Sequence, residues 1–293
     1  LRRAPIASAP GRAPQETTNQ RVQAEMIQEM MAQKVDAIIL ATEGPAAQEA
    51  AAPFITQAVE QGIVVLMVNF DQLAYPYPAH GAIGVSQRRG TQKTGEYAAQ
   101  LLQGKPINVG LIEGEPSYFS TERLGGFVDG LAGANMTIAG SVNGHWDTPG
   151  GYNATLTLMK EHPEINVIAA ANDFEIIGAA SALETLKRSD VLLFGYDGVP
   201  DAISRIAEGK ITGTILADAY HMGQVAMQVV IDTLQGRFRG GFVENPTVLI
   251  TQANAKEYLA ASDKEALTGN LQDITVVSEP LPGFTNGDGT GLY

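Results

Sequence analysis

The sequence contains no cysteine, which excludes disulfide bonds, thiolate metal ligands and a cysteine nucleophile. Basic charge is also scarce: 19 Lys and Arg residues and 32 Asp and Glu residues give a formal net charge of −13. A general binder of nucleic acid or of anionic membranes would be expected to have a basic surface, so both classes are disfavoured. No apolar run is long enough to span a bilayer. The composition is that of a globular protein without nucleic-acid partners.

Motifs of common enzymes and metal sites are missing as well. The four histidines are His80, His145, His162 and His221, and no HExxH or other ligand spacing connects them, so we expect no metal site. There is no GxSxG nucleophile elbow, no Walker A loop and no GxGxxG after a first strand. We expect no catalytic residue, no cofactor and no enzymatic activity. An α/β hydrolase or a nucleotide-sugar enzyme is the alternative that these absences count against.

What the sequence does contain is a regular alternation of short apolar runs and amphipathic segments. Strands are predicted at 35–40, 63–68, 107–112, 165–170, 191–196, 211–216 and 246–251. Helices are predicted at 19–34, 46–61, 92–103, 120–131, 152–161, 174–186, 201–208 and 222–234. The alternation predicts βαβ units and an α/β fold with parallel sheets covered on both faces. A length of 293 residues favours two lobes over one small core.

Polar side chains follow several of these predicted strands. They are Asn69 and Asp71 after 63–68, Arg123 beyond 107–112, Asn172 after 165–170, Asp197 after 191–196, and Asp218 after 211–216. Ligands of open α/β sheets bind at the carboxyl ends of the strands, so these residues predict one common site. A carboxylate accepts hydrogen bonds from hydroxyl groups and an arginine donates through a planar fork, so the set suits a neutral polyhydroxylated ligand. Trp146, the single tryptophan, adds a flat apolar face for a sugar ring.

Each of these residues also has a simpler interpretation. A single Asp or Asn after a strand is more often a helix N-cap than a ligand contact. Trp146 alone is more often a core residue, and Arg123 alone is equally compatible with a surface salt bridge. His145 and His221 are predicted to be structural. The predicted site therefore depends on the agreement of five strand ends and not on any one residue.

Six segments together resemble the type I periplasmic sugar-binding proteins, the ribose/galactose-binding group that shares its fold with the effector domains of LacI-type repressors. They are QKVDAIIL (33–40), TERLGGF (121–127), HPEINVI (162–168), AND (171–173), FGYDGVPD (194–201) and GKITGTI (209–215), and the resemblance extends from about residue 19 to residue 259. It implies two doubly wound parallel-sheet lobes joined by three crossovers, with a ligand cleft between them that closes by a hinge.

The resemblance also implies domain limits. The N-terminal lobe is expected to contain residues 1–104 with part of 218–245, and the C-terminal lobe residues 105–217 with 246–259. Residues 260–293 are expected to form a tail, from which 272–284 could join the N-terminal lobe.

Individual roles follow from the same resemblance. Arg123 corresponds to an arginine at the start of a C-lobe helix, Trp146 to an aromatic residue over one ring face, and Asn172 and Asp197 to residues that bond ring hydroxyls. Asn69 and Phe70 stand where the family often has Asp-Arg, and Ala217 stands where ribose binders have glutamine, so the ligand need not be ribose. The predicted ligand-binding residues are Asn69, Phe70, Asp71, Phe119, Arg123, Trp146, Asn172, Asp197 and Asp218.

One departure from the family concerns its first strand and helix, which have no counterpart before residue 5. Only residues 5–9 remain to serve as the second strand, so we expect a gap in the middle of the N-lobe sheet unless another segment fills it. Residues 273–284 are one candidate, as in a circular permutation. Alternatively, 274–293 resembles the opening of a type II solute-binding domain, and the chain comes from a tandem sensor.

The expected function is that of a non-enzymatic binding protein, periplasmic or otherwise extracytoplasmic. It is expected to enclose a small polyhydroxylated ligand, a monosaccharide, by hinge closure for ABC-type uptake. The expected partners are the sugar-like ligand and a membrane permease or receptor kinase, and the protein is expected to be a monomer. A ligand-sensing domain of a membrane receptor or histidine kinase is the alternative. A LacI-type repressor effector domain is less compatible, because the helix-turn-helix is missing and the net charge is −13.

Overall fold

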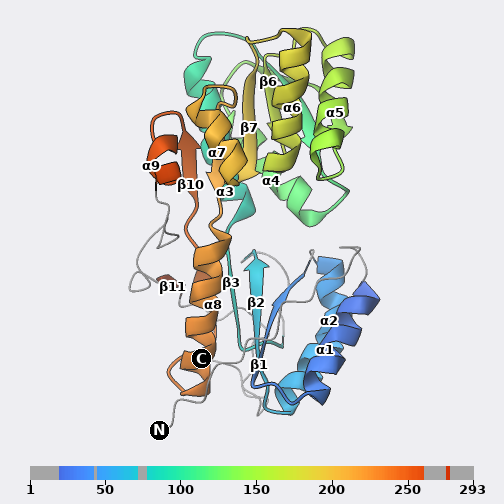
Figure 1. Ribbon diagram of the computed structural model, residues 1–293, viewed down its shortest axis with the longest axis vertical. Coiled ribbons are helices and arrows are strands. Elements are labelled where there is room, and N and C mark those ends of the chain that lie inside the picture. The colour runs from blue at the N-terminus through green and yellow to red at the C-terminus, as the bar shows by residue number, and fades with distance from the viewer. Residues whose placement is uncertain (1–19, 43–44, 72–77, 261–274, 278–293) are drawn as a thin grey trace.

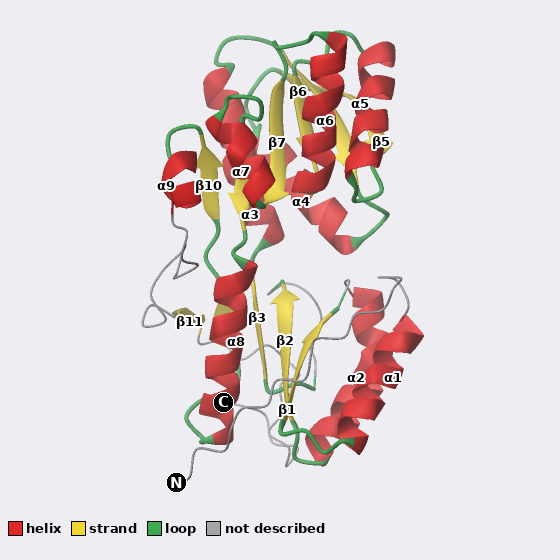
Figure 2. Ribbon diagram, in the orientation of Figure 1, coloured by secondary structure: helices red, strands yellow, loops and turns green. Residues whose placement is uncertain are grey.

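The chain forms two α/β lobes, each built around one sheet (Figure 1). The computed structural model describes residues 20–42, 45–71, 78–260 and 275–277. Helices lie on both faces of each sheet (Figure 2), which confirms the predicted class of two doubly wound α/β lobes. Within these described ranges, no helix combines the length and the hydrophobicity that a bilayer-spanning segment needs.

The N-terminal lobe contains a five-stranded sheet in the order β1-β2-β3-β9-β11. Its strands are β1 (Ala37–Ala41), β2 (Val64–Phe70), β3 (Gly81–Gly84), β9 (Phe242–Glu244) and β11 (Thr275–Val277). Helices α1 (Gln20–Ala32) and α2 (Pro45–Glu60) cover one face, and α8 (Ala219–Leu234) covers the other. The first four strands are parallel, while β11 pairs antiparallel with β9.

Strand β2 shows why the sequence of this lobe reads as continuous apolar runs. Val65 and Met67 are buried in the cluster formed with α1 and α2, whereas Val64 and Leu66 are buried in the cluster formed with α8. Successive side chains of a strand point to opposite faces, so a strand covered on both faces must be apolar at every position.

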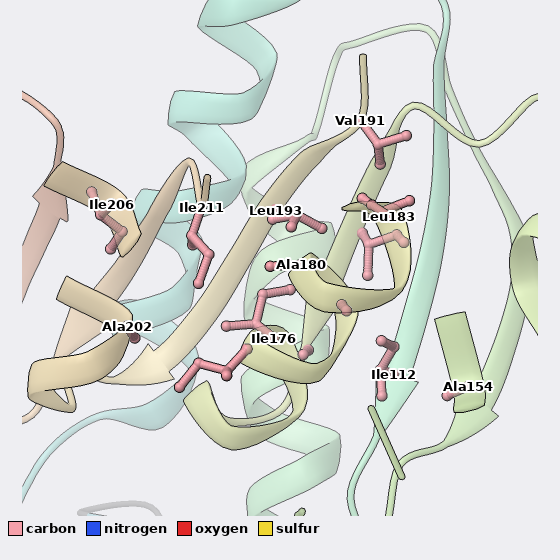
Figure 3. Packing of buried hydrophobic residues seen from close by; sticks show 14 of the residues in the cluster. Ile112, Ala154, Ile176, Ala180, Leu183, Val191, Leu193, Ala202, Ile206 and Ile211 are labelled. Carbon is pink, nitrogen blue, oxygen red and sulfur yellow. The ribbon is translucent and has the colours of Figure 1, made fainter. Parts of the chain in front are cut away.

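The C-terminal lobe contains a six-stranded sheet in the order β10-β8-β7-β6-β4-β5. Its strands are β4 (Ile107–Glu113), β5 (Met136–Asn143), β6 (Val167–Ala170), β7 (Leu192–Asp197), β8 (Gly213–Leu216) and β10 (Val248–Thr251). Its helices are α3 (Gln87–Leu101), α4 (Tyr118–Gly130), α5 (Thr148–Glu161), α6 (Asp173–Leu186), α7 (Pro200–Ala207) and α9 (Ala255–Ala260). Figure 3 shows the core beneath α6, where Ile176, Ala180 and Leu193 belong to one buried cluster.

Three described connections join the lobes, at residues 85–86, 217–218 and 245–247. The predicted boundary at residue 104 is wrong for α3, because this helix packs against α4 and the C-terminal sheet. Glycines allow the close contact: a Cβ atom at Gly95 would lie 2.1 Å from the carbonyl oxygen of Phe127. The first connection therefore precedes α3.

Several strands differ from the prediction. The predicted strand 246–251 is present as β10, but it runs antiparallel to β8. The chain enters β10 directly from the other lobe, at the end of the sheet where the parallel strands finish, so it can only run in the opposite direction. Strands β3, β5 and β9 were not predicted, since β3 and β9 are very short and β5 is an edge strand of half-buried and exposed residues without an apolar run.

The expected gap in the N-terminal sheet is not observed among the described strands. Strand β2 pairs with both β1 and β3, and β3 pairs with β9, so the described sheet is continuous. Strand β11 lies at the edge opposite β1 and so does not replace a central strand. Residues 5–9, and all of 260–293 except Ala260 and β11, lie outside the described residues, so the two proposed origins of this tail remain predictions.

Replacing Gly126 of α4 by Ala is expected to destabilise the protein. The added Cβ atom would lie 2.1 Å from the carbonyl oxygen of Arg88 and 2.2 Å from Oγ1 of Thr91. Overpacking against backbone that cannot move freely costs about 2 kcal/mol. The matched control is Gly223→Ala on α8, where an added Cβ meets no atom within 4 Å. That change is expected to stabilise the protein by about 0.5–1 kcal/mol in urea unfolding. Equal effects at the two glycines would contradict the close packing of α3 against α4.

Candidate ligand-binding site

A cavity of about 740 Å³ lies between the two lobes, at the carboxyl ends of β2, β7 and β8. Its polar lining includes Asn69, Arg123, Asp197 and Asp218. The remaining lining is mainly apolar and includes Val68, Ile203, Leu216, Met222 and Tyr258. A volume of several hundred cubic ångström with a few convergent polar groups is typical of small-molecule sites.

Arg123 on α4 is the central charged residue of this site. It is only 8% exposed, and its guanidinium is held from three directions. Nε donates to Oε1 of Gln87 at 2.9 Å, Nη1 donates to the carbonyl oxygen of Ala171 at 3.0 Å, and Nη1 also forms an ion pair with Oδ1 of Asp197 at 3.2 Å. Cζ lies 3.9 Å from the centre of the Tyr196 ring. Among the described residues none bonds Nη2, so this group is available to a ligand.

Two further aromatic rings lie beside the same guanidinium. The rings of Phe119 and Trp146 are each centred 5.8 Å from Cζ of Arg123. Trp146 has a φ of 62°, and its backbone N–H donates to Oε1 of Glu175 at 3.0 Å. A Cβ atom at Gly114 would lie 2.0 Å from the indole, so glycine is required there for the ring to reach this position. The aromatic residues therefore form one wall with Arg123.

The carboxylate of Asp197 is displayed by a strained turn. Asp197 has a φ of 113°, which few non-glycine residues adopt and which costs about 1–3 kcal/mol. The buried Asp173 holds the turn: its Oδ2 accepts from the N–H groups of Gly198 at 2.7 Å and Val199 at 2.8 Å, and its Oδ1 accepts from Oγ1 of Thr214 at 2.6 Å. The side chain of Asp197 remains 34% exposed beside Arg123. The turn thus presents a carboxylate to the cavity.

Asn172 and Asp218 both serve as helix N-caps, as the simpler interpretation of these residues predicts. Oδ1 of Asn172 accepts from the N–H of Glu175 at 2.9 Å, and its Nδ2 donates to the carbonyl oxygen of Trp146 at 3.0 Å. Oδ1 of Asp218 accepts from the N–H of His221 at 3.0 Å. Asp218 also lines the cavity, whereas Asn172 is not among the lining residues.

The N-terminal lobe contributes fewer of the predicted ligand-binding residues to the cavity. Asn69, with a φ of 55°, lines the cavity, and its N–H donates to Sδ of Met222 at 3.3 Å. Asp71 is 2% exposed, and its Oδ2 accepts from the N–H of Gln87 at 3.1 Å, so it supports the site from behind. The side chain of Phe70 lies outside what the structure describes.

The predicted residues are thus brought together unequally. The cavity joins Asn69, Arg123, Asp197 and Asp218, and Phe119 and Trp146 lie beside Arg123. Whether each of them contacts a ligand stays a prediction. In the described part of the chain, no cluster of three His, Asp or Glu side chains is arranged to hold a metal ion.

The sequence did not predict the apolar lining of the cavity, nor the residues that hold Arg123, Asp197 and Trp146 in place, which are Gln87, Asp173, Glu175 and Tyr196. The pattern Asn172-x-x-Glu175 is a capping box, so Glu175 was detectable from the sequence. Tyr196 lies within an apolar strand and resembles a core residue. The sequence around Gln87 has no motif that would mark it as a site residue, because its hydrogen-bond partners come from distant segments.

Burial raises the pKa of three carboxyl groups around the site. It raises the pKa of Asp173 to about 8, and the negative charge of nearby Asp197 adds to this effect. It raises the pKa of Glu175 to about 7, although N–H groups from Trp146 and Asn172 oppose the shift. It also raises the pKa of Asp197, opposed by the Arg123 guanidinium. The site therefore contains carboxyl groups that change protonation close to neutral pH.

Two α/β lobes that share a cavity with a few polar groups at their strand ends define a small-molecule binding protein of the two-lobed class. The sequence model of a protein family, described as a periplasmic binding protein domain, matches residues 8–238 of this chain. The chain therefore belongs to the periplasmic binding protein family, whose members are binding proteins, and the resemblance predicted from the six segments is confirmed.

Individual relatives support this assignment. A D-ribose/D-allose-binding protein from Pseudomonas aeruginosa is 28% identical over 244 residues, which are 80% of this chain and 75% of the relative. A D-apiose import binding protein from Paraburkholderia graminis is 26% identical over 240 residues, covering 80% of this chain and 74% of that protein. Among solved structures, a periplasmic solute-binding protein of an ABC transporter from Actinobacillus succinogenes, with bound D-allose, is 26% identical. It matches with a TM-score of 0.74 over 82% of this chain and 86% of that one.

Replacing Glu175 by Gln is expected to reduce the dependence of stability on pH. The pKa of Glu175 is raised from 4.5 in the unfolded chain to about 7 in the fold, so its contribution to stability is complete below about pH 4.5 and is lost as pH rises through 7. The free energy of unfolding of the unmodified protein should therefore fall more steeply between about pH 5 and pH 7 than that of the variant. Urea unfolding at several pH values measures both slopes. Equal slopes would contradict the assigned protonation of Glu175.

Proposed function

We propose that this protein is a non-enzymatic binding protein that encloses a monosaccharide between its lobes. The observation that carries the proposal is the pairing of Arg123 with Asp197 at the cavity wall. One group donates and the other accepts, so together they complement adjacent hydroxyl groups, each of which can do both. The nearby rings of Phe119 and Trp146 supply apolar faces suited to the C–H surface of a sugar ring.

The names of the relatives support the same ligand class. The relative from Pseudomonas aeruginosa is named for D-ribose and D-allose, and the structure from Actinobacillus succinogenes contains D-allose. Asn69, Phe70 and Ala217 differ from the ribose pattern, so the ligand need not be ribose. Asn172 and Asp218 can contribute a second hydrogen bond each beyond their capping bonds, since an amide or carboxylate oxygen has more than one acceptor position.

Binding is proposed to proceed by rotation of the lobes about the three connections at 85–86, 217–218 and 245–247. Closure removes the sugar hydroxyls from water, so each must find a partner in the protein. The affinity then depends on how completely Arg123, Asp197 and their neighbours satisfy them.

The proposed setting is outside the cytoplasm, where the closed form delivers the sugar to an ABC-type membrane permease. Names of relatives as import binding proteins support this partner. A receptor kinase that binds the closed form of the protein is the alternative partner. We propose that the protein acts as a monomer, because one chain provides both walls of the cavity.

Calorimetric titration with a panel of D-ribose, D-allose, D-galactose, D-apiose and myo-inositol tests the proposal. We expect at least one of these compounds to bind at micromolar concentration, with heat released as hydroxyls are buried. If none binds at millimolar concentration, the monosaccharide assignment fails. Amino acids serve as the negative control.

Replacing Asp197 by Ala is expected to weaken binding of the best sugar by about 2–4 kcal/mol, because hydroxyl groups would be buried without an acceptor. Asp201→Ala on α7 is the matched control, since that carboxylate is exposed and forms a salt bridge with Arg205. The Asp201→Ala variant should bind the sugar with unchanged affinity. An Asp197→Ala variant that binds as tightly as the control would remove Asp197 from the site.

A further inference from the structure

Gln87 occupies an unusual position between the two lobes. It is the first residue of α3, directly after the connection at 85–86, and it is completely buried. Its backbone N–H donates to Oδ2 of Asp71 at 3.1 Å, and its side-chain Oε1 accepts from Nε of Arg123 at 2.9 Å. One residue thus connects a carboxylate at the end of an N-lobe strand with the central guanidinium of the C-lobe site.

The backbone half of this connection follows from helix chemistry. The first N–H groups of a helix have no partner within it, and the helix dipole favours a negative charge at that end. Ser86 caps α3 through its side chain, which accepts from the N–H of Arg89, and the carboxylate of Asp71 satisfies the N–H of Gln87. The beginning of α3 is thereby attached to the N-terminal lobe.

The side-chain half determines how Arg123 is oriented. Nη1 interacts with the carbonyl oxygen of Ala171 and with the carboxylate of Asp197, and Nε donates to Gln87. These interactions fix the plane of the guanidinium over the Tyr196 ring. Nη2 is the group that the described residues leave open. Without the acceptor on Gln87, Nε would be buried without a partner, and the guanidinium would turn to satisfy it.

We propose that Gln87 is a positioning residue for the ligand site: it holds Arg123 in the orientation that presents Nη2 to the cavity, and it links that orientation to the N-terminal lobe through Asp71. The inference deepens the proposed function and rests on it for the nature of the ligand. Its part about the orientation of Arg123 is independent of any ligand.

The single tryptophan provides a reporter that needs no ligand. Trp146 lies 5.8 Å from the Arg123 guanidinium, so its fluorescence depends on where that cation lies. Gln87→Met preserves the approximate shape of the side chain but removes the acceptor, whereas Gln87→Glu keeps an acceptor oxygen. Gln100→Met is the matched control, because Gln100 lies exposed on the same helix.

The ligand-free proteins should separate into two groups. Gln87→Met is expected to change the emission of Trp146, while Gln87→Glu and Gln100→Met keep the emission of the unmodified protein. For the tightest sugar of the panel, Gln87→Met should lose at least about tenfold in affinity, and Gln87→Glu should stay within about threefold. Circular dichroism and urea unfolding establish that each variant is folded.

Two results would overturn the proposal. One is unchanged emission and affinity in Gln87→Met; the other is a Gln87→Glu variant that fails as Gln87→Met does, since the acceptor would then not be the feature that matters. If Gln87→Met does not fold, the Gln87→Glu variant tests the proposal alone. A changed Trp146 emission or a lost sugar affinity in Gln87→Glu would then contradict the positioning role of Gln87. If the unmodified protein binds no sugar, the proposed function fails, but the emission comparison still decides whether Gln87 positions Arg123.

Discussion

The burial of one guanidinium, that of Arg123, is the constraint on which the rest of the site depends. A cation that is 8% exposed is stable only where acceptors and aromatic faces replace water. The replacements come from separate elements: Gln87 at the start of α3, Ala171 after β6, and Tyr196 and Asp197 on β7. The site therefore exists only when the C-terminal sheet and both helices on its α3 face are assembled.

The two lobes contribute different parts of the ligand-binding site. The C-terminal lobe holds a preformed cluster in which the buried Asp173 supports the turn of Asp197, and Glu175 supports the backbone of Trp146. The N-terminal lobe adds Asn69 and the face of α8 to the cavity. Three short connections join the lobes, so closure can bring the two walls together without rebuilding either one.

The sequence predicted the parts of this structure that depend on local chemistry. Apolar runs placed most strands to within a few residues, and the polar residues predicted to follow them include Arg123 and Asp197, which both line the cavity. What it could not predict depends on distant partners. The antiparallel direction of β10, the edge positions of β1 and β11, and the place of α3 beside α4 follow from long-range pairing and from glycine contacts. Gln87 was missed for the same reason, since Asp71 and Arg123 are remote in sequence.

Enclosure of a sugar by hinge closure draws the lobes together around Arg123, and the distance between the lobes tests this directly. The chain has no cysteine, so spin labels can be attached at two introduced cysteines alone, replacing the exposed residues Glu60 on α2 and Lys160 on α5. Pulsed electron paramagnetic resonance then measures the distance between the labels with and without the tightest sugar of the panel. Hinge closure predicts a shorter distance between the labels and a narrower distance distribution when the sugar is saturating. A distance that is unchanged while calorimetry shows the sugar bound would contradict enclosure by hinge closure.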